Sequence, residues 1–242
     1  MKPLAPLAIL ALTLAPSLAH AAPAGDAAGG KGLSIVLVIA VVSLVPFLFL
    51  SLTAFVKIST VLQITKSAIG AQSVPSSAVV IALSGALTLL AMAPTATVVA
   101  ERAAPLLSDR IEDAAAVARL ADAAREPMRA FLRANASDRE RGRFLEVARS
   151  ARPEADRGKV SEADFSVLAP AFVVTELGEA FAVGFLIFLP FLVIDLVVAN
   201  VLASLGLQNL GVTQVSLPFK LLLFVAVDGW GLLAQALVAG YR

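Results

Sequence analysis

The sequence predicts an all-α integral membrane protein in which two hydrophobic helical hairpins, at 33–100 and 166–242, flank a charged helical segment at 101–165. Hydrophobic residues make up 59% of the chain and charged residues only 15%, and the mean hydropathy is +0.88. A soluble domain has no need of so much apolar surface. The charged segment is the exception, because Glu101–Asp164 holds 13 of the 18 acids and 13 of the 19 bases. We therefore assign the apolar runs to the membrane and the charged block to water.

The composition excludes several kinds of site. The chain has no cysteine, and its single histidine, His20, falls in a predicted signal peptide. Thiol nucleophiles, zinc sites made of cysteine or histidine, and serine–histidine catalysis are therefore excluded from the mature protein. A net charge of +1 gives no reason to expect nucleic acid as a partner. We predict no catalytic, metal-binding or cofactor-binding residue.

Residues 1–22 have the pattern of a secretory signal peptide. Lys2 precedes an apolar stretch, Leu4–Leu18, and Ala19–Ala21 forms an Ala-x-Ala cleavage site. An uncleaved anchor is the alternative, which the three prolines and the shortness of the apolar run disfavour. Residues 23–32 are rich in glycine and alanine and are expected to form a linker. Cleavage would leave the mature N-terminus outside the membrane.

The first hairpin, 33–100, is predicted from two uncharged runs. Gly32–Val56 is long enough to cross a hydrocarbon core about 30 Å thick. The connection that follows contains Lys57 and Lys66 and no acid, so the positive-inside tendency places it on the cytoplasmic side. Ala78–Ala100 then returns the chain to the outside.

The charged segment, 101–165, reads as solvated helices on the outer, periplasmic side. Apolar residues recur at helical spacing up to a break at Asn135–Ser137. Ser137 is the predicted N-cap of the next helix, because Glu140 follows three residues later. Arg152 and Pro153 are expected to end that helix. We favour a spacer role for this segment, with partner binding as the alternative.

The second hairpin, 166–242, is predicted as two long helices at Val167–Leu205 and Val215–Gly240, joined by an uncharged loop. The first helix is too long for one simple span, so we expect tilt, a break near Pro190, or extension beyond the membrane. Prolines interrupt the apolar runs of both hairpins, and fixed kinks are favoured over gating hinges. These predicted kinks are at Pro46, Pro94, Pro190 and Pro218.

Five charged residues lie in or at the edge of the apolar runs of the second hairpin: Glu176, Glu179, Asp195, Lys220 and Asp228. A charge there costs about 2.5 kcal/mol or more to insert, so each one needs a partner or a function. Glu176 and Glu179 share a helix face. They could be a proton-accepting pair, but we favour a subunit contact near the outer mouth, paired with a base from a neighbouring subunit or from the charged segment.

Asp195 and Lys220 lie on the two helices of the hairpin and could meet across it. Lys220 and Asp228 are about 12 Å apart along one helix, so they cannot pair directly. A buried pair contributes little to stability and more to register or specificity. Assembly is therefore the favoured role of these charges.

Three stretches of the sequence carry a resemblance to a known family. They are GFLIFLPFLVIDLVVANVLASLG at Gly184–Gly206, VSLPFKLLLFVAVDGW at Val215–Trp230, and the block Pro46–Thr95. Together with FLRANASDRERGRF in the charged segment, they resemble the type III secretion export-apparatus family called SctR in injectisomes and FliP in flagella. The resemblance extends over nearly all of Leu33–Arg242, and the injectisome branch is favoured.

The resemblance implies a subunit of the export gate in the bacterial inner membrane. Members of the family form a pentamer with two smaller membrane proteins, of the SctS/FliQ and SctT/FliR types, within the basal body and its other export-apparatus proteins. Unfolded substrates pass through this assembly. The resemblance further implies that the helices are raised toward the periplasmic side, so a four-span topology would describe insertion and not the final state.

The resemblance also points to a pore seal in the loop after the first signature helix. The family commonly has a run of methionines there, which suits a deformable gasket. This sequence instead has Leu205, Leu207, Gln208, Asn209 and Leu210 as the candidate gasket residues. Either the leucines make the seal, or the gate is wetter than most. A plain hairpin turn is the remaining alternative.

An autonomous proton-linked transporter that relays ions through the intramembrane carboxylates is the alternative function. The absence of inverted repeats between the two halves speaks against it. The absence of an intramembrane histidine does so as well.

Overall fold

The computed structural model describes residues 39–40, 43–44, 46–71, 75–106, 114–207 and 209–241, and this part of the chain is helical without any strand. The predicted signal peptide and linker, at 1–32, and Gln208 lie outside these residues. A helical stretch at Pro46–Leu52 precedes the labelled helices. These are α3 (Phe55–Ile69), α4 (Ser77–Ala91), α5 (Ala93–Ala103), the 3-10 turn η1 (Ala104–Leu106), α6 (Ala114–Asn135), α7 (Asp138–Ser150), α8 (Glu154–Arg157), α9 (Phe165–Ser204), α10 (Val212–Ala226) and α11 (Gly229–Ala239).

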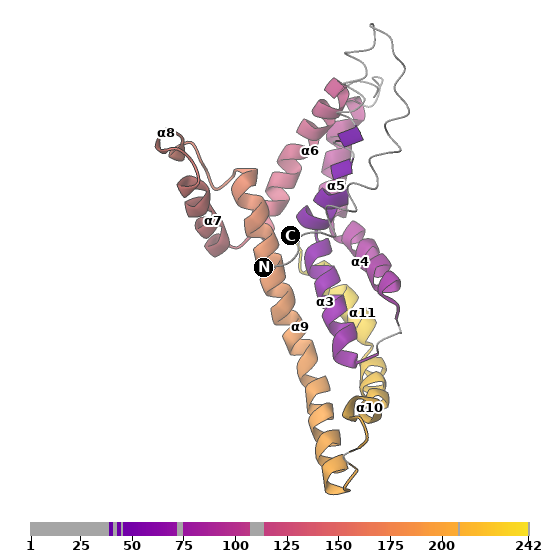
Figure 1. The fold of residues 1–242 in the computed structure, drawn as a ribbon. Coiled ribbons are helices and arrows are strands. Elements are labelled where there is room, and N and C mark those ends of the chain that lie inside the picture. Colours follow the sequence, from indigo (N-terminus) through magenta and orange to yellow (C-terminus); the bar gives the residue numbers. More distant parts are fainter. Residues whose placement is uncertain are drawn as a thin grey trace, which may run out of the picture.

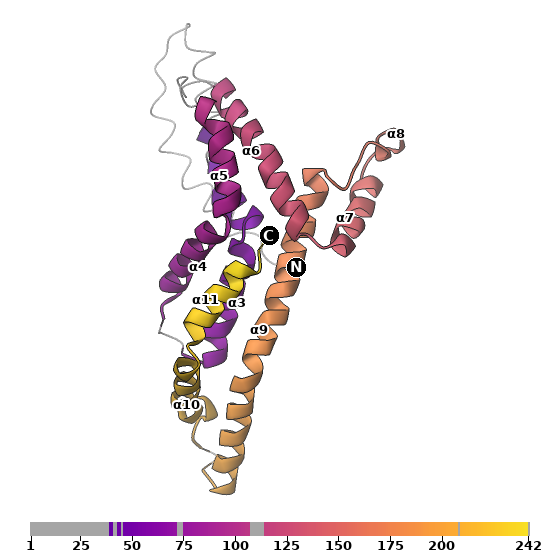
Figure 2. The same cartoon turned by 180° about the vertical axis from the view of Figure 1, so that it is seen from behind.

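Helix α9 runs along most of the length of the elongated molecule (Figure 1). Helices α3 and α10 pack against α9, α11 packs against α4 and α10, and α6 pairs with α5 and also contacts α9. Helix α7 packs on the other side of α9, and the same arrangement is seen from behind (Figure 2). The two hairpins predicted from sequence are therefore not separate bodies, because α3 of the first lies directly on α9 of the second.

In the described residues only α9 is, by itself, long and apolar enough to cross a membrane. Three further candidates are pairs of helices bent at a short break. Their bends are 74° between Pro46–Leu52 and Phe55–Ile69, 63° between Ser77–Ala91 and Ala93–Leu106, and 58° between Val212–Ala226 and Gly229–Ala239. Counting each bent pair as one span gives up to four spans, in agreement with the hydropathy of the sequence.

The predicted proline kinks have different outcomes. Pro94 lies at the start of α5, directly after the 63° bend between α4 and the helix that follows. Pro190 and Pro218 lie inside α9 and α10, which continue through them. A break near Pro190, one of the three alternatives for the long helix, therefore does not occur, and kinks at these two prolines stay predictions. A proline removes one backbone hydrogen bond from a transmembrane helix, but neighbouring groups or a small local change in helix geometry can satisfy the freed carbonyl. The residue before Pro46 is outside the described part, and the large bend of that segment is at Thr53 and Ala54.

The second helix of the second hairpin is also not continuous, which corrects the predicted span Val215–Gly240. It begins earlier, at Val212, and breaks at Val227 and Asp228. Asp228 has φ 51° and ψ 50°, the left-handed conformation that a non-glycine residue rarely adopts. Aspartate tolerates this region better than most side chains, which is why the break can occur at this residue.

The charged segment contains the predicted cap and the predicted breaks. The backbone N–H of Glu140 donates to the Ser137 hydroxyl at 3.3 Å at the start of α7, which ends at Ser150 before Pro153. The segment is more than a solvated spacer, however. Phe131 and Leu132 of α6 are buried in the main core, and α7 packs along α9.

The core of the fold is the contact between α3 and α9. Ile58, Val61 and Leu62 on the first helix are fully buried, as are Leu168 and Phe172 on the second. Sequence reasoning treats this part of α3 as a connection between spans. The bend at Thr53 and Ala54 instead turns α3 so that it lies along α9.

Gly184 permits the closest approach of these two helices. A Cβ atom at this position would lie 2.6 Å from Cδ1 and 2.8 Å from Cγ2 of Ile64. Because isoleucine is branched at Cβ, its side chain cannot rotate both carbons away. We expect Gly184→Ala to lower the free energy of unfolding by about 1–3 kcal/mol through overpacking, measured by thermal unfolding in detergent.

Gly178 supplies a matched control in the same helix, since a Cβ there would meet nothing within 4 Å. Gly178→Ala should raise the stability by up to about 1 kcal/mol, because alanine favours the helix. Equal effects of the two substitutions would show that Gly184 has no special packing role.

Candidate functional site

A buried cluster of charges joins α3 to α9. Lys57 Nζ lies 3.0 Å from Glu176 Oε1 and 2.7 Å from Glu179 Oε2. The Glu176 side chain is completely buried and that of Lys57 is 9% exposed, whereas the Glu179 side chain is 55% exposed. The Lys57–Glu176 contact is an ion pair without the geometry of a hydrogen bond. One cation thus serves two carboxylates, as expected for acids that share a helix face.

The identity of this cation corrects the prediction for Glu176 and Glu179. We expected a base from a neighbouring subunit or from the charged segment, and the partner is Lys57 of the first hairpin. The prediction placed Lys57 on the cytoplasmic side and Glu176 near the outer mouth. Since the two groups touch, they cannot lie on opposite sides of a membrane.

Tyr241 closes this cluster from the C-terminal end of the chain. Its hydroxyl contacts the Glu176 carboxylate and lies 3.2 Å from the backbone oxygen of Ala54. Its ring stacks on Phe131 at 6.0 Å between centroids, and Lys57 Nζ lies 4.5 Å from the ring centroid. Burial, followed by the nearby Glu176 charge, raises the pKa of the Tyr241 phenol. It is therefore a neutral hydrogen-bond donor to the carboxylate.

The contribution of the Tyr241 hydroxyl to the free energy of unfolding should be measurable in a single variant. Tyr241→Phe keeps the ring stacked on Phe131 but leaves Glu176 without its neutral donor. Because hydrogen bonds to charged groups contribute about 1.5–3 kcal/mol, we expect a loss of that order in the free energy of unfolding. Thermal unfolding of the purified variant in detergent tests this, and an unchanged transition would contradict the assigned contact.

A second charged pair lies nearer the tip of the α9–α10 hairpin. Lys220 Nζ is 2.7 Å from Asp195 Oδ2 and 3.2 Å from the backbone oxygen of Ala68, and Ser216 donates to Asp195 Oδ1 at 2.6 Å. The predicted pairing of Asp195 with Lys220 across the hairpin is confirmed. The contact with Ala68 was not predicted, and it fixes the hairpin to the last turn of α3.

Asp228 is confirmed to lie apart from Lys220, which pairs elsewhere. Its side chain is exposed at the break between α10 and α11 and caps no backbone N–H. The carboxylate lies over Gly231, where an added Cβ would come within 2.4 Å of Asp228 Oδ2. The glycine at the fourth position of the Asp-Gly-Trp-Gly sequence therefore leaves the space that the Asp228 carboxylate occupies.

Four of the five candidate gasket residues lie in the described part of the hairpin tip, and all four are exposed on the surface of the protomer. Leu205, Leu207 and Leu210 are 65%, 45% and 49% exposed, and Asn209 is exposed as well. Gly206, at φ 72°, ends α9, and the N–H of Leu207 donates to the oxygen of Leu202 at 2.9 Å. This geometry makes a tight turn with apolar side chains directed outward.

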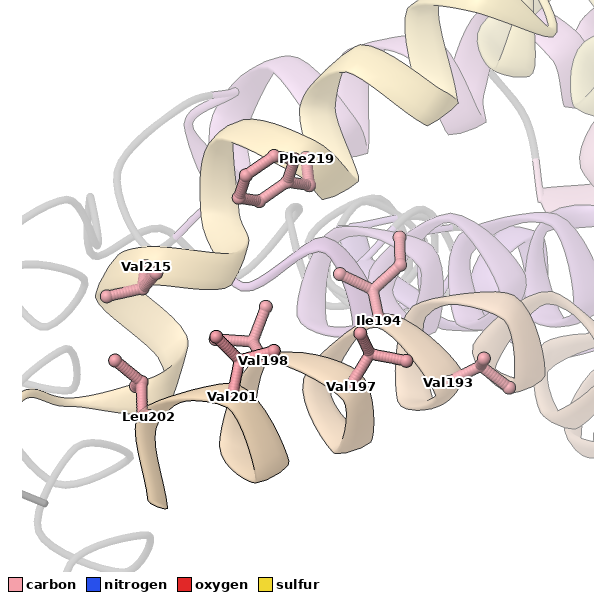
Figure 3. Close-up of a pocket in the computed structure, with 8 residues that line it drawn as sticks. All are labelled: Val193, Ile194, Val197, Val198, Val201, Leu202, Val215 and Phe219. Atoms are coloured by element: carbon pink, nitrogen blue, oxygen red, sulfur yellow. The ribbon is translucent and has the colours of Figure 1, made fainter. Parts of the chain in front are cut away.

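Behind the tip, α9 and α10 enclose a groove of about 420 Å³ (Figure 3). Its lining is entirely aliphatic and aromatic: Val193, Ile194, Val197, Val198, Val201, Leu202, Val215 and Phe219. The groove offers no polar group for catalysis or for metal binding. Its chemistry suits packing against another apolar surface.

Comparisons with known proteins agree with these observations. The model of the FliP family matches residues 38–237. The hypersensitivity response secretion protein HrcR of Ralstonia nicotianae is 39% identical over 86% of this chain and 97% of its own length. The flagellar biosynthetic protein FliP of Cereibacter sphaeroides is 42% identical over 86% of this chain and 67% of its own length. The Yop proteins translocation protein R of Yersinia pestis is 34% identical over 86% of this chain and 96% of its own length. The chain therefore belongs to the FliP family.

Proposed function

We propose that this protein is a core subunit of the inner-membrane export gate of a type III secretion system, where it lines and seals the pore for unfolded substrates. The observation that carries the proposal is the family match over residues 38–237, with relatives named for secretion, translocation and flagellar biosynthesis. We further propose assembly as a pentamer with the SctS/FliQ and SctT/FliR types of small membrane subunit, placed toward the periplasmic side.

The surface of α9 supports assembly into a larger complex. Large apolar side chains remain exposed along the helix, including Phe181, Phe185 and Leu186, each at least 62% exposed. A helix that is hydrophobic all round needs lipid or protein on its uncovered side. In the proposed gate, neighbouring subunits and lipid cover this surface.

The charges of the hairpins support a structural role over ion transport. Glu176, Glu179 and Asp195 each have a cationic partner within the chain. A carboxylate held in an ion pair is poorly suited to accept and release protons in a relay. We therefore assign these residues to assembly and register, and the chain to no catalytic reaction.

The pore seal is proposed for the exposed tip of the α9–α10 hairpin. Leu205, Leu207 and Leu210 would form an apolar ring when several copies surround one axis, with the amides of Gln208 and Asn209 in the same loop. Leucine can exclude water but repacks less readily than methionine. We favour the injectisome branch, since the chain spans 97% of the Ralstonia relative and 96% of the Yersinia relative.

The native mass of the detergent-solubilised protein, co-expressed with its two small membrane partners, tests the proposal. We expect a complex containing about five copies of this chain. A stable monomer or dimer that does not associate with the partners would contradict the export-gate function.

A further inference from the structure

One exposed face of α11 differs in composition from the exposed surface of the helix before it. Its residues, which we call the α11 face, are Asp228, Gly231, Gln235 and Ala239, all exposed and three or four positions apart. The opposite side of the helix is buried through Gly229 and Leu237. On α10, by contrast, the exposed residues include Leu222 at 72% and Val225 at 74%. The α11 face is therefore small and polar, whereas the exposed surface of α10 is large and apolar.

Asp228 supplies the charge of the α11 face. No residue that the structure describes forms an ion pair with its carboxylate or donates a hydrogen bond to it. Its left-handed backbone sets the side chain over Gly231, where an added Cβ would lie 2.4 Å from Asp228 Oδ2. A carboxylate that leaves water for an apolar environment needs a cation beside it. Whatever covers this face must therefore bring a positive charge.

Gln235 supplies hydrogen-bonding groups two turns further along the helix, about 10 Å from Asp228 along the axis. Its exposed amide can both donate and accept. Interfaces between transmembrane helices are enriched in glycine and alanine, and amide side chains form hydrogen bonds across them. Gly231 and Ala239, one turn before and one turn after the amide, allow another backbone to come close. This composition favours a packed helix over lipid as the cover of the α11 face.

The base that faces Asp228 is best supplied by a different protein. The described helices between 46 and 100 and between 165 and 241 contain three bases, and each has a partner in its own chain. Lys57 and Lys220 form ion pairs, and Lys66 donates to the Ser77 hydroxyl at 3.2 Å. A second copy of this chain would have to break one of these contacts to offer a base from its apolar helices. A helix of another protein would not.

We propose that the α11 face binds a transmembrane helix of a different protein, which places a lysine or arginine against Asp228 and a hydrogen-bonding side chain against Gln235. This inference rests on the proposed function, because the two small membrane subunits of the gate are the candidates for that helix. The break between α10 and α11 then serves to present the carboxylate at the first turn of the contact.

Removal of the charge tests the contact with the base. Asparagine has the shape of aspartate and also tolerates the left-handed conformation, so Asp228→Asn should leave the thermal unfolding of the isolated protomer unchanged. After co-expression with the two small membrane subunits, it should lower the amount of at least one of them that copurifies at least tenfold. Gly231→Ala should act in the same direction, because the added Cβ displaces the carboxylate. Glu162→Gln neutralises an exposed acid outside the apolar helices, and this control should leave the recovery unchanged.

Photo-crosslinking identifies the helix that covers the face. The chain contains no cysteine, so Gln235→Cys introduces the only one, and a benzophenone maleimide attached to it reacts with any neighbouring side chain. We expect the adduct on a membrane helix of one small subunit, within about two turns of a lysine or arginine. Changing that base to glutamate together with Asp228→Lys should restore the recovery of the subunit to within about threefold of the unaltered complex.

The outcomes separate this inference from the proposed function. The inference is wrong, and the gate function stands, if Asp228→Asn recovers both small subunits within twofold of the unaltered protein or if the adducts form only on copies of this chain. It is also wrong if the Gln235→Cys variant reacts with a charged, water-soluble maleimide as fast in the complex as in the free protomer, because the face would then line water. If the unaltered protein recovers neither small subunit, the proposed function fails and this inference fails with it.

Discussion

Replacing Lys57 with methionine should destabilise the protein by about 3–5 kcal/mol, the cost of leaving one member of a buried ion pair without its partner. Glu176 is completely buried, and after the substitution only the Tyr241 hydroxyl would contact its carboxylate. Methionine preserves most of the apolar volume of the lysine stem, so the loss reports the charge. Thermal unfolding in detergent and the amount of protein in the membrane fraction are the measurements.

Two further variants show whether the loss of stability arises from the unpaired Glu176 carboxylate. Lys66→Met changes the same residue type in the same helix but removes no acid's partner within the chain, so the isolated protomer should keep nearly its full stability. Lys57→Met/Glu176→Gln should be more stable than Lys57→Met, because no buried charge remains unpaired. If Lys57→Met and Lys66→Met had equal effects, the Lys57–Glu176 pair would not contribute to folding.

The contrast between the two charged pairs shows what the sequence can predict. Asp195 and Lys220 lie on consecutive helices joined by a short loop, so a hairpin alone brings them to the same level. Lys57 and Glu176 are separated in the sequence by the whole charged segment. No pattern of neighbouring residues predicts that α3 packs on α9. The only available signal was the balance of charge, with two acids in one apolar run and a base at the edge of another.

The same distinction applies to the backbone. The Ser137 cap and the bend beside Pro94 were predictable because they depend on neighbouring residues. The break near Pro190, one of three alternatives for the long helix, does not occur, because a long apolar helix can accommodate a proline that would break a short one. The break at Asp228 was missed, although two glycines close to an aspartate are a typical signal for a turn. The role of the loop at Leu205–Leu210 stays a prediction, since it depends on other copies of the chain.

Replacing Asp195 with alanine should produce the second large effect, again about 3–5 kcal/mol of lost stability. Lys220 is 3% exposed, and without Asp195 its ammonium would contact only the backbone oxygen of Ala68. The converse change should be milder, because the Asp195 side chain is 30% exposed and keeps its hydrogen bond from Ser216. Thermal unfolding in detergent should therefore rank Asp195→Ala below Lys220→Met.

The double variant Asp195→Ala/Lys220→Met separates the role of the pair in stability from its role in register. Removing both charges leaves no unpaired group, so the protomer should recover most of the stability that Asp195→Ala loses. If the pair fixes the position of the α9–α10 hairpin against α3, the double variant should still yield less ring complex than its stability predicts. A double variant as unstable as Asp195→Ala would show that the cost arises from lost packing and not from an unpaired cation.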